Sequence, residues 1–184
     1  MRIISGIHKG RRIQAPKKLP VRPTTDMAKE ALFNILRNKT FVHGSTVLEL
    51  FAGSGNMSYE FASRGASSIT AVDEHTPCIK FIESTATKLE MPIDTIKADV
   101  FQFLSQHQGQ YDLIFADPPY ALDIDQFNNI PDLVFERNLL KEDGILIVEH
   151  SKHTDLQSHQ YCTESRRYGG TVFSFFPNSS GEEE

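Results

Sequence analysis

From residue 46 onward, short apolar runs alternate with longer stretches of helical periodicity, and this alternation constrains the fold more than any other feature. Strands are predicted near residues 46–51, 68–73, 93–98, 111–117 and 144–149, and helices near 56–64, 75–89, 100–107 and 124–138. Repeated strand-helix-strand units form mostly parallel sheets with helices on both faces. The sequence therefore predicts a single α/β domain, for which 184 residues supply a sufficient core.

The end of the chain departs from this alternation. Two β-rich runs, at 159–167 and 171–177, flank Tyr168-Gly169-Gly170. A glycine turn between two such runs predicts a hairpin, which would give the sheet an antiparallel edge. The polar and acidic residues 178–184 are predicted to be a disordered tail.

The beginning of the chain reads as an arm rather than as part of the alternation. Residues 1–22 are interpreted as irregular or β-rich, with turns at Gly6 and Gly10, because prolines at 16, 20 and 23 exclude a long helix. A helix is expected to start at a cap formed by Thr25 or Asp26 and to end near Arg37. Its sheet-facing side is predicted to carry Met27, Ala31, Leu32, Ile35 and Leu36.

Charge is unevenly distributed along the chain. The overall formal charge of -5 divides into about +8 over residues 1–40 and about -13 over the rest. A basic arm can follow phosphates, whereas an acidic body does not bind polyanions indiscriminately and suits a cationic cofactor. We therefore expect three parts: a phosphate-contacting arm and helix at 1–40, the main domain at 41–177 and the tail at 178–184. The alternative is that the arm is charged only because it is exposed to solvent, and that it contacts no phosphates.

Several other classes of protein are disfavoured. Cys78 and Cys162 offer neither a disulfide framework nor a paired metal motif, and the seven histidines lack metal spacing, so no metal is expected. His150 and His153 come nearest to a pair and are interpreted as surface residues. No apolar run reaches the roughly 18 to 20 residues of a membrane span, and no signal-peptide pattern is present. We expect a soluble, cytoplasmic monomer.

The first predicted strand, at 46–51, leads into Ala52-Gly53-Ser54-Gly55. A glycine loop at a strand end typically forms part of a nucleotide-like pocket, although any tight strand-to-helix turn can contain one. Ser58 stands where a dinucleotide fingerprint has its third glycine, and no Walker lysine follows. Nicotinamide or flavin enzymes and nucleoside triphosphatases are therefore disfavoured.

Carboxylates recur at the ends of successive predicted strands, where they would line one crevice. Glu49 could face the amino group of a methionine moiety, Asp73 could accept from both ribose hydroxyls, and Asp99 could accept from an adenine amine. Each has a structural alternative: a cation partner for Glu49, and helix capping for the two aspartates. Together they predict S-adenosylmethionine as the cofactor.

Asp117-Pro118-Pro119-Tyr120 closes the apolar run 111–116 and has the spacing of a catalytic loop. An aromatic amine is a weak nucleophile, because its lone pair is delocalised into the ring. If the Asp117 carboxylate and a carbonyl near Pro118 accept the amine hydrogens, the lone pair turns outward towards the methyl donor. Prolines present carbonyls without competing donors, and Tyr120 can stack on the target base. The tetrapeptide predicts methyl transfer to an exocyclic amine.

These motifs resemble the RsmD family, bacterial methyltransferases that modify a guanine N2 in 16S ribosomal RNA. The likeness covers nearly the whole chain. The stretches that carry it are Arg2-Ile-Ile-Ser-Gly6, Lys9-Gly-Arg11, Arg22-Pro-Thr-Thr-Asp26, Lys29-Glu-Ala-Leu-Phe-Asn34, Leu48-Glu-Leu-Phe-Ala-Gly-Ser-Gly55 and the tetrapeptide. The resemblance implies a Rossmann-like class I methyltransferase sheet of seven strands with the last one antiparallel.

The resemblance also implies site residues and partners. The cofactor, released as S-adenosylhomocysteine, would contact Glu49, Phe51, Gly53, Gly55, Asp73, Glu74, Asp99, Val100 and Asp117. The 16S RNA, free or within the small ribosomal subunit, would contact Arg2, Lys9, Arg11, Arg12, Arg22, Thr24, Thr25 and Asp26. Relatives often have Glu at the place of Asp73 and a second acid at that of His75, so ribose binding could differ here.

Four alternatives stay open. An adenine-N6 methyltransferase would use the same tetrapeptide, but the chain has no room for a separate DNA-recognition domain. A protein glutamine methyltransferase usually has Asn in place of Asp117. A catalytically idle RNA-binding protein would keep the cofactor as a fold ligand. A nicotinamide oxidoreductase would bind a hydride-carrying cofactor.

Overall fold

The computed structural model describes residues 1–22 and 24–179. Its centre is a sheet of seven strands in the order β3-β2-β1-β4-β5-β7-β6. The strands are β1 (Thr46–Leu50), β2 (Ser68–Asp73), β3 (Ile93–Lys97), β4 (Tyr111–Ala116), β5 (Leu140–Ser151), β6 (Glu164–Tyr168) and β7 (Thr171–Pro177). β1 to β5 pair in parallel, and β7 pairs antiparallel with both β5 and β6. The predicted α/β class, with its antiparallel last strand, is confirmed.

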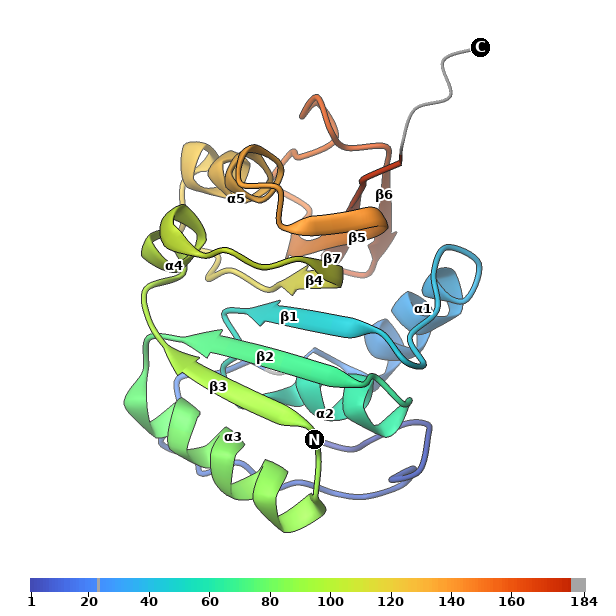
Figure 1. The fold of residues 1–184 in the computed structure, drawn as a ribbon, viewed down its shortest axis with the longest axis vertical. Helices are drawn as coiled ribbons and strands as arrows, with labels where there is room; N and C mark the ends of the chain where they lie inside the picture. Colours follow the sequence, from blue (N-terminus) through green and yellow to red (C-terminus); the bar gives the residue numbers. More distant parts are fainter. Residues whose placement is uncertain (23, 180–184) are drawn as a thin grey trace.

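Helices cover both faces of the sheet (Figure 1). They are α1 (Asp26–Leu36), α2 (Asn56–Ser63), α3 (Thr76–Leu89), α4 (Val100–Gln106) and α5 (Ile124–Glu136). One core cluster joins α1, α2 and α3 to the sheet, and a second joins α4 and α5 to its other face. Because both faces are covered, the central strands are apolar along most of their length.

Successive side chains of a strand point to opposite faces, and β1 shows how this places a functional group. Val47 belongs to the cluster under α1 to α3, whereas Leu48 and Leu50 belong to the cluster under α4 and α5. Glu49 therefore points to the same face as Val47 and is buried there. A carboxylate in this position needs a specific partner, because burial without one is costly.

Side-chain caps determine where three of the helices begin. Thr25 Oγ1 accepts from the Ala28 amide at 3.2 Å and starts α1, and Asp99 Oδ1 accepts from the Gln102 amide at 3.0 Å and starts α4. Asp123 forms a capping box with Gln126 at the start of α5. The predicted cap of α1 is confirmed as Thr25.

The buried side of α1 differs from the prediction. Met27 is 75% exposed. The buried positions are Ala28, Lys29, Leu32, Phe33 and Leu36, so the packed face is rotated by about one residue from the predicted one. The prediction was misled by Lys29, a charged residue that is buried because it has polar partners inside the protein.

Three further predictions near the carboxyl end are corrected. His150, predicted to be a surface residue, is buried in β5, where its ring bonds Ser174 Oγ at 2.7 Å. Residues 159–161 form a turn and residues 162–163 have no regular structure, so strand β6 of the hairpin begins at Glu164. Asn178 continues the ordered chain, since its amide donates to the Gly144 carbonyl at 2.8 Å. Residues 180–184 of the predicted tail lie outside the described residues.

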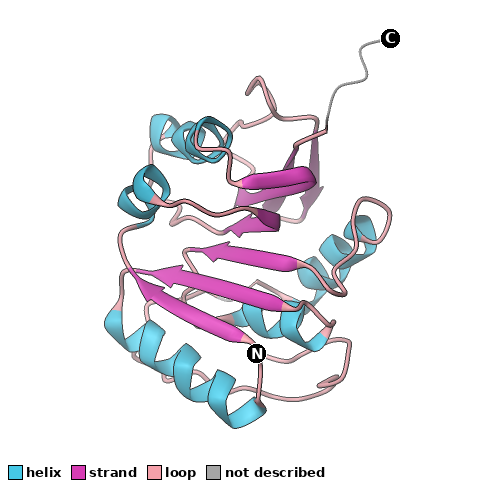
Figure 2. Ribbon diagram, in the orientation of Figure 1, coloured by secondary structure: helices cyan, strands magenta, loops and turns pink. Residues whose placement is uncertain are grey.

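Residues 1–22 form no helix and no extended strand, so the irregular alternative is confirmed and the β-rich one is wrong; Figure 2 shows this arm as a loop that runs beside the helices. An isolated bridge pairs Arg2 with Arg12, and Ile3 is buried in the core cluster. Gly6 approaches α2 so closely that a Cβ there would lie 1.8 Å from the Ser63 carbonyl oxygen. The arm is therefore docked on the domain, and its backbone turn requires a glycine.

Candidate functional site

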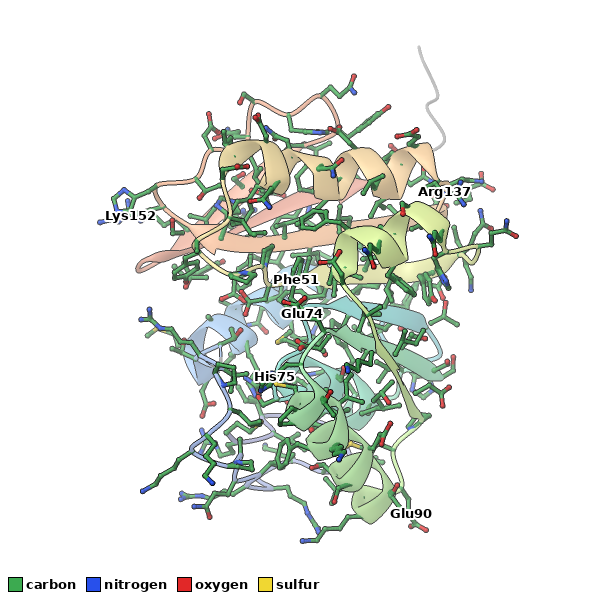
Figure 3. All side chains as sticks on the ribbon, turned by 90° about the vertical axis from the view of Figure 1, so that its left-hand side faces the viewer. Phe51, Glu74, His75, Glu90, Arg137 and Lys152 are labelled. Atoms are coloured by element: carbon green, nitrogen blue, oxygen red, sulfur yellow. The ribbon has the colours of Figure 1, made fainter. Side chains whose placement is uncertain are left out.

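A cavity of about 790 Å³ opens at the carboxyl ends of the parallel strands. Figure 3 looks onto this edge, with Phe51, Glu74 and His75 at its centre. Most of the predicted site residues line this cavity: Arg22, Thr24, Thr25, Glu49, Phe51, Gly53, Asp73, Glu74, Asp99, Val100, Asp117, Pro118, Pro119 and Tyr120. Segments far apart in the sequence thus meet where an open α/β sheet binds its ligands.

The glycine loop turns sharply after β1. Phe51, Gly53 and Gly55 all have positive φ, at 57°, 56° and 83°, which is a strained backbone conformation for a residue as large as Phe51. A Cβ on Gly53 would lie 2.9 Å from Val21 Cγ1, and one on Gly55 would lie 2.8 Å from the Tyr59 ring. Gly53 therefore leaves the cavity wall open, whereas Gly55, which is absent from the cavity lining, shapes the turn.

Asp73 joins the glycine loop to the end of β2. Its Oδ2 accepts from the Gly53 amide at 2.8 Å, and its Oδ1 accepts from the His75 amide at 2.8 Å. Each carboxylate oxygen has a second lone pair, so two ribose hydroxyls can still bind. The structural and the ligand-binding interpretations of Asp73 are therefore compatible.

Helix capping and ligand binding are compatible for Asp99 too. Its Oδ1 caps α4, which leaves Oδ2 without a hydrogen bond from any residue that the structure describes. The neighbouring Phe101 ring packs edge-on against Phe51, with 6.1 Å between the centroids, and both rings line the cavity. An apolar wall beside a free carboxylate oxygen suits a flat ring that carries an amine.

Glu49 lies at the base of the cavity. Its carboxylate accepts from the Ser58 hydroxyl, and no cation pairs with it among residues 1–22 and 24–179, so the alternative of a cation partner is wrong. Burial raises the pKa of Glu49 to about 8, against the Ser58 hydrogen bonds, and the charges of Asp73 and Glu149 add to the rise. A cationic ligand would relieve this cost by stabilising the ionised form.

The tetrapeptide begins where β4 ends. The Asp117 carboxylate accepts no hydrogen bond from the described part of the chain, and burial, followed by the charges of Glu149 and Glu49, raises its pKa well above the ordinary value. Pro118 is buried, whereas Tyr120 is 50% exposed at the rim. The loop therefore places a free acceptor in the cavity and an aromatic ring at its mouth.

Glu149, two residues before the end of β5, is a site residue that was not predicted. It is buried, it lines the cavity, and its Oε2 accepts from Thr24 Oγ1 at 2.9 Å. Burial raises its pKa to about 7 in spite of that hydrogen bond. The signal was present in the sequence, because residue 149 closes a predicted strand just as Asp73 and Asp117 do.

The residues predicted to contact RNA divide into two groups. Arg22, Thr24 and Thr25 line the cavity, and Pro23 lies outside the described residues. The exposed arm residues Arg2, Lys9, Arg11 and Arg12, together with Asp26, are absent from the cavity lining. Asp26 pairs with Arg2 at 3.1 Å, so a salt bridge is its observed interaction.

A chain of buried polar groups connects the arm to the cavity. Lys29 Nζ donates to the Arg2 carbonyl at 2.6 Å and to Asn56 Oδ1 at 3.0 Å. Asn56 Nδ2 in turn donates to the Thr24 carbonyl at 3.1 Å. Since the Thr24 hydroxyl bonds Glu149, this chain holds both the backbone and the side chain at residue 24. Lys29, which begins the stretch Lys29–Asn34 of the family resemblance, thus makes its hydrogen bonds to groups inside the protein.

The acids at the strand ends fit S-adenosylmethionine. Glu49 and Asp117 lack a cation partner in the described part of the chain and suit a ligand with ammonium and sulfonium groups, while Asp73 and Asp99 offer acceptors for its ribose and amine. In residues 1–22 and 24–179, no cluster of His, Cys, Asp or Glu could hold a metal ion. Across the same ranges, no helix has the length and apolar composition needed to cross a bilayer.

Comparisons with known proteins agree with this architecture. The chain is 32% identical over 168 residues to Ribosomal RNA small subunit methyltransferase D of Haemophilus influenzae, covering 85% of this chain and 81% of the relative. The solved structure of yhhF from Escherichia coli superposes with a TM-score of 0.82 at 22% identity, covering 98% of this chain and 99% of that one.

A more distant structural neighbour is the 16S rRNA N2 methyltransferase RsmC of T. thermophilus, solved with AdoMet and guanosine. Its TM-score is 0.69 at 18% identity, over 86% of this chain and 45% of that one, which shows a shared fold. The family model described as Conserved hypothetical protein 95 matches residues 1–177. On this match and on the 32% identity to methyltransferase D, the chain belongs to the RsmD family.

Proposed function

We propose that this protein transfers a methyl group from S-adenosylmethionine to the exocyclic N2 amine of a guanine in 16S ribosomal RNA. The observation that carries the proposal is the Asp117 carboxylate, a free acceptor at the end of β4 in the same cavity as the strand-end acids. The relative named Ribosomal RNA small subunit methyltransferase D supports the RNA substrate.

The cofactor would lie along the ends of β1, β2 and β3. Glu49 would hold its amino group, Asp73 its ribose and Asp99 its adenine amine, with Phe51, Gly53, Glu74 and Val100 forming the walls. When bound, S-adenosylmethionine supplies an electrophilic methyl group on a sulfonium centre. Glu49 and Asp117 would attract this cation in their ionised forms, and the charge of the cation would lower the raised pKa of each carboxyl group.

The tetrapeptide would prepare the nucleophile. Asp117 and the Pro118 carbonyl accept the two amine hydrogens and direct the nitrogen lone pair towards the methyl group. The nitrogen would bond to the methyl carbon as the carbon–sulfur bond breaks, which leaves a neutral thioether. One proton of the resulting cationic amine would then pass to the Asp117 carboxylate. Tyr120, half-exposed at the rim, stacks on the base, which must leave its own stack to enter.

The arm would bind the RNA backbone. Lys9, Arg11 and Arg12 are exposed on a segment docked against α2, and Arg22 continues this basic character to the cavity itself. Phosphate contacts of this kind position a nucleic acid without reading its sequence. The residues proposed to hold the cofactor and the target amine all lie on one chain and line one cavity, so the proposed chemistry needs no second copy.

The proposal is tested by Asp117→Ala with labelled methyl transfer to small ribosomal subunits that lack base methylation. Loss of a charge-assisted hydrogen bond to the amine is expected to lower the transfer rate at least roughly 100-fold, with cofactor affinity changed only a few-fold. The matched control is Asp125→Ala, which removes an exposed aspartate on α5 and leaves the rate unchanged. Transfer by Asp117→Ala at the rate of the unaltered protein would refute the proposal.

A further inference from the structure

Carboxylates lie on both sides of Asp117, and the order of the strands assigns them to different halves of the cavity. β1, β2 and β3 lie on one side of β4, and β5 lies on the other. Asp73 and Asp99 belong to the first side, where the cofactor is expected. Glu149 belongs to the β5 side. It is therefore separated from the cofactor half by the tetrapeptide that would hold the target amine.

Glu149 and Asp117 are neighbours across two parallel strands. Ala116, the last residue of β4, pairs with Val148, so Asp117 and Glu149 each come one residue after this pair. Successive residues alternate between faces, so paired positions point the same way. The two carboxylates thus face the same part of the cavity, and the charge of Glu149 adds to the burial that raises the pKa of Asp117. A base whose amine reaches Asp117 brings its adjacent ring atom towards Glu149.

The Glu149 carboxylate is held in place and keeps an acceptor free. Thr24 Oγ1 fixes Oε2, and Thr24 is itself held through Asn56. Oε1 accepts no hydrogen bond from any residue in 1–22 or 24–179, although only 4% of Glu149 is exposed. Because Glu149 lines the cavity and this oxygen has no partner in those ranges, it is free to accept from a donor on a ligand.

The three amine-bearing bases differ at the atom beside the amine. In guanine the neighbouring ring nitrogen, N1, carries a hydrogen and donates. In adenine and cytosine the corresponding nitrogen carries no hydrogen and accepts. An ionised carboxylate only accepts, so it attracts the guanine edge and repels the other two.

We propose that Glu149 accepts a hydrogen bond from guanine N1–H and thereby selects guanine over adenine and cytosine. This inference rests on the proposed function and deepens it, because it assigns base choice to a residue outside the tetrapeptide. The two amine hydrogens stay with Asp117 and the Pro118 carbonyl, so the two roles do not compete. Thr24 acts as a positioning residue that orients Glu149.

The test replaces the guanine that the unaltered protein methylates with 2-aminopurine, in small-subunit RNA built with a synthetic segment. 2-Aminopurine keeps the amine but has an acceptor at N1. The unaltered protein is expected to prefer guanine by about 100-fold in kcat/KM, as for a lost hydrogen bond to a charged group. In Glu149→Gln the side-chain amide can accept from or donate to N1 of the base. The preference of this variant for guanine over 2-aminopurine is therefore expected to fall below about threefold.

Two controls separate base recognition from a structural role. Thr24→Val removes the hydroxyl but leaves the carboxylate, so it should lower the rate while keeping most of the preference for guanine. Cofactor affinity of Glu149→Gln should stay within a few-fold of the unaltered protein. A Glu149→Gln variant that retains the 100-fold preference, whether fast or slow, would overturn the inference. If the unaltered protein methylates no guanine, the proposed function fails first.

Discussion

Two buried carboxylates, Glu49 and Glu149, share the cavity with the half-buried Asp117, and their removal from water governs how the site responds to pH. Burial is the largest cause of the raised pKa of each, and their mutual repulsion adds to it for Glu49 and Asp117. Neutral acids are therefore favoured in the folded protein without ligand. A cationic cofactor would shift all three towards the ionised state that the proposed chemistry needs.

This arrangement predicts that the ligand-free protein loses stability between about pH 6.5 and 8. The folded state holds protons on Glu149, with a pKa of about 7, and on Glu49, with a pKa of about 8, that the unfolded chain has already released. The free energy of unfolding should therefore fall with rising pH, by on the order of 2 kcal/mol over this window. Urea unfolding at several pH values measures it.

Other titrating groups act mainly outside that window. Burial lowers the pKa of His107 and of His150, which gives stability that rises with pH but only up to about pH 6.5. Asp112 and Glu164 have lowered pKa values and titrate under more acidic conditions.

The decline in the free energy of unfolding with rising pH should be smaller in Glu49→Gln. It should also be smaller in the presence of saturating S-adenosylmethionine. An equal decline in Glu49→Gln would show that the buried acids are not its cause.

At single positions, sequence reasoning succeeded where a strand end is visible and failed where a contact is long-range. Asp73, Asp99 and Asp117 were found because each closes or follows an apolar run. Glu149 satisfied the same rule and was overlooked. Its partner Thr24 lies 125 positions away in sequence, so no local pattern could have joined them.

At the scale of elements, the arm is attached to α1 and α2 by buried polar contacts rather than by strand pairing. Glu60 of α2 is fully buried, and both of its oxygens accept from the Ile4 amide, at 3.2 and 3.1 Å. Arg64 bonds Glu60 Oε1 at 3.0 Å, and Lys29 Nζ lies 3.9 Å from Oε2. The arm therefore depends on charges that are paired only in the folded protein.

Lys29→Met is expected to lower the free energy of unfolding by roughly 3 kcal/mol. The change keeps the length of the side chain but leaves the Arg2 carbonyl and Asn56 Oδ1 without their donor, and it removes one partner of a buried charge. Denaturant unfolding measures the loss. Lys88→Met, at an exposed position of α3, is the control and should change stability by less than about 0.5 kcal/mol. A similar small effect of Lys29→Met would contradict the account.

The positions of most elements could be predicted because their periodicity is strong. The predicted strands and helices between residues 46 and 138 agree with the structure to within about two residues. The side of α1 that packs could not be predicted, because a pattern of apolar residues cannot show that Lys29 is buried with partners. Residues 159–163 look extended in sequence, and only packing determines that strand β6 starts at Glu164.

At the scale of the whole molecule, charge is separated between a basic arm of about +8 and an acidic remainder of about -13. The arm reaches the cavity through Val21, Arg22 and Thr24. This arrangement allows RNA to be held beside a cavity whose own charge suits a cation. Net charge alone would have argued against a nucleic-acid partner, whereas its distribution supports one.

Arg11→Ala combined with Arg12→Ala is expected to weaken RNA binding and to flatten its salt dependence, while cofactor affinity stays the same. If both side chains contact phosphates, a plot of the logarithm of the RNA association constant against the logarithm of salt concentration should become less steep by about 2. Titrations at several salt concentrations measure it. The control, Lys80→Ala with Lys88→Ala, removes the same charge from the exposed side of α3. Loss of cofactor binding in the arm variant would instead assign the arm a structural role.

The central claim is that one cavity joins S-adenosylmethionine to a guanine amine of ribosomal RNA. Its most direct test is transfer of labelled methyl to small ribosomal subunits that lack base methylation, followed by nucleoside analysis. The account predicts N2-methylguanosine as the single labelled product, formed in equal amount with S-adenosylhomocysteine. Labelled N6-methyladenosine, or no transfer by protein that binds the cofactor, would contradict it.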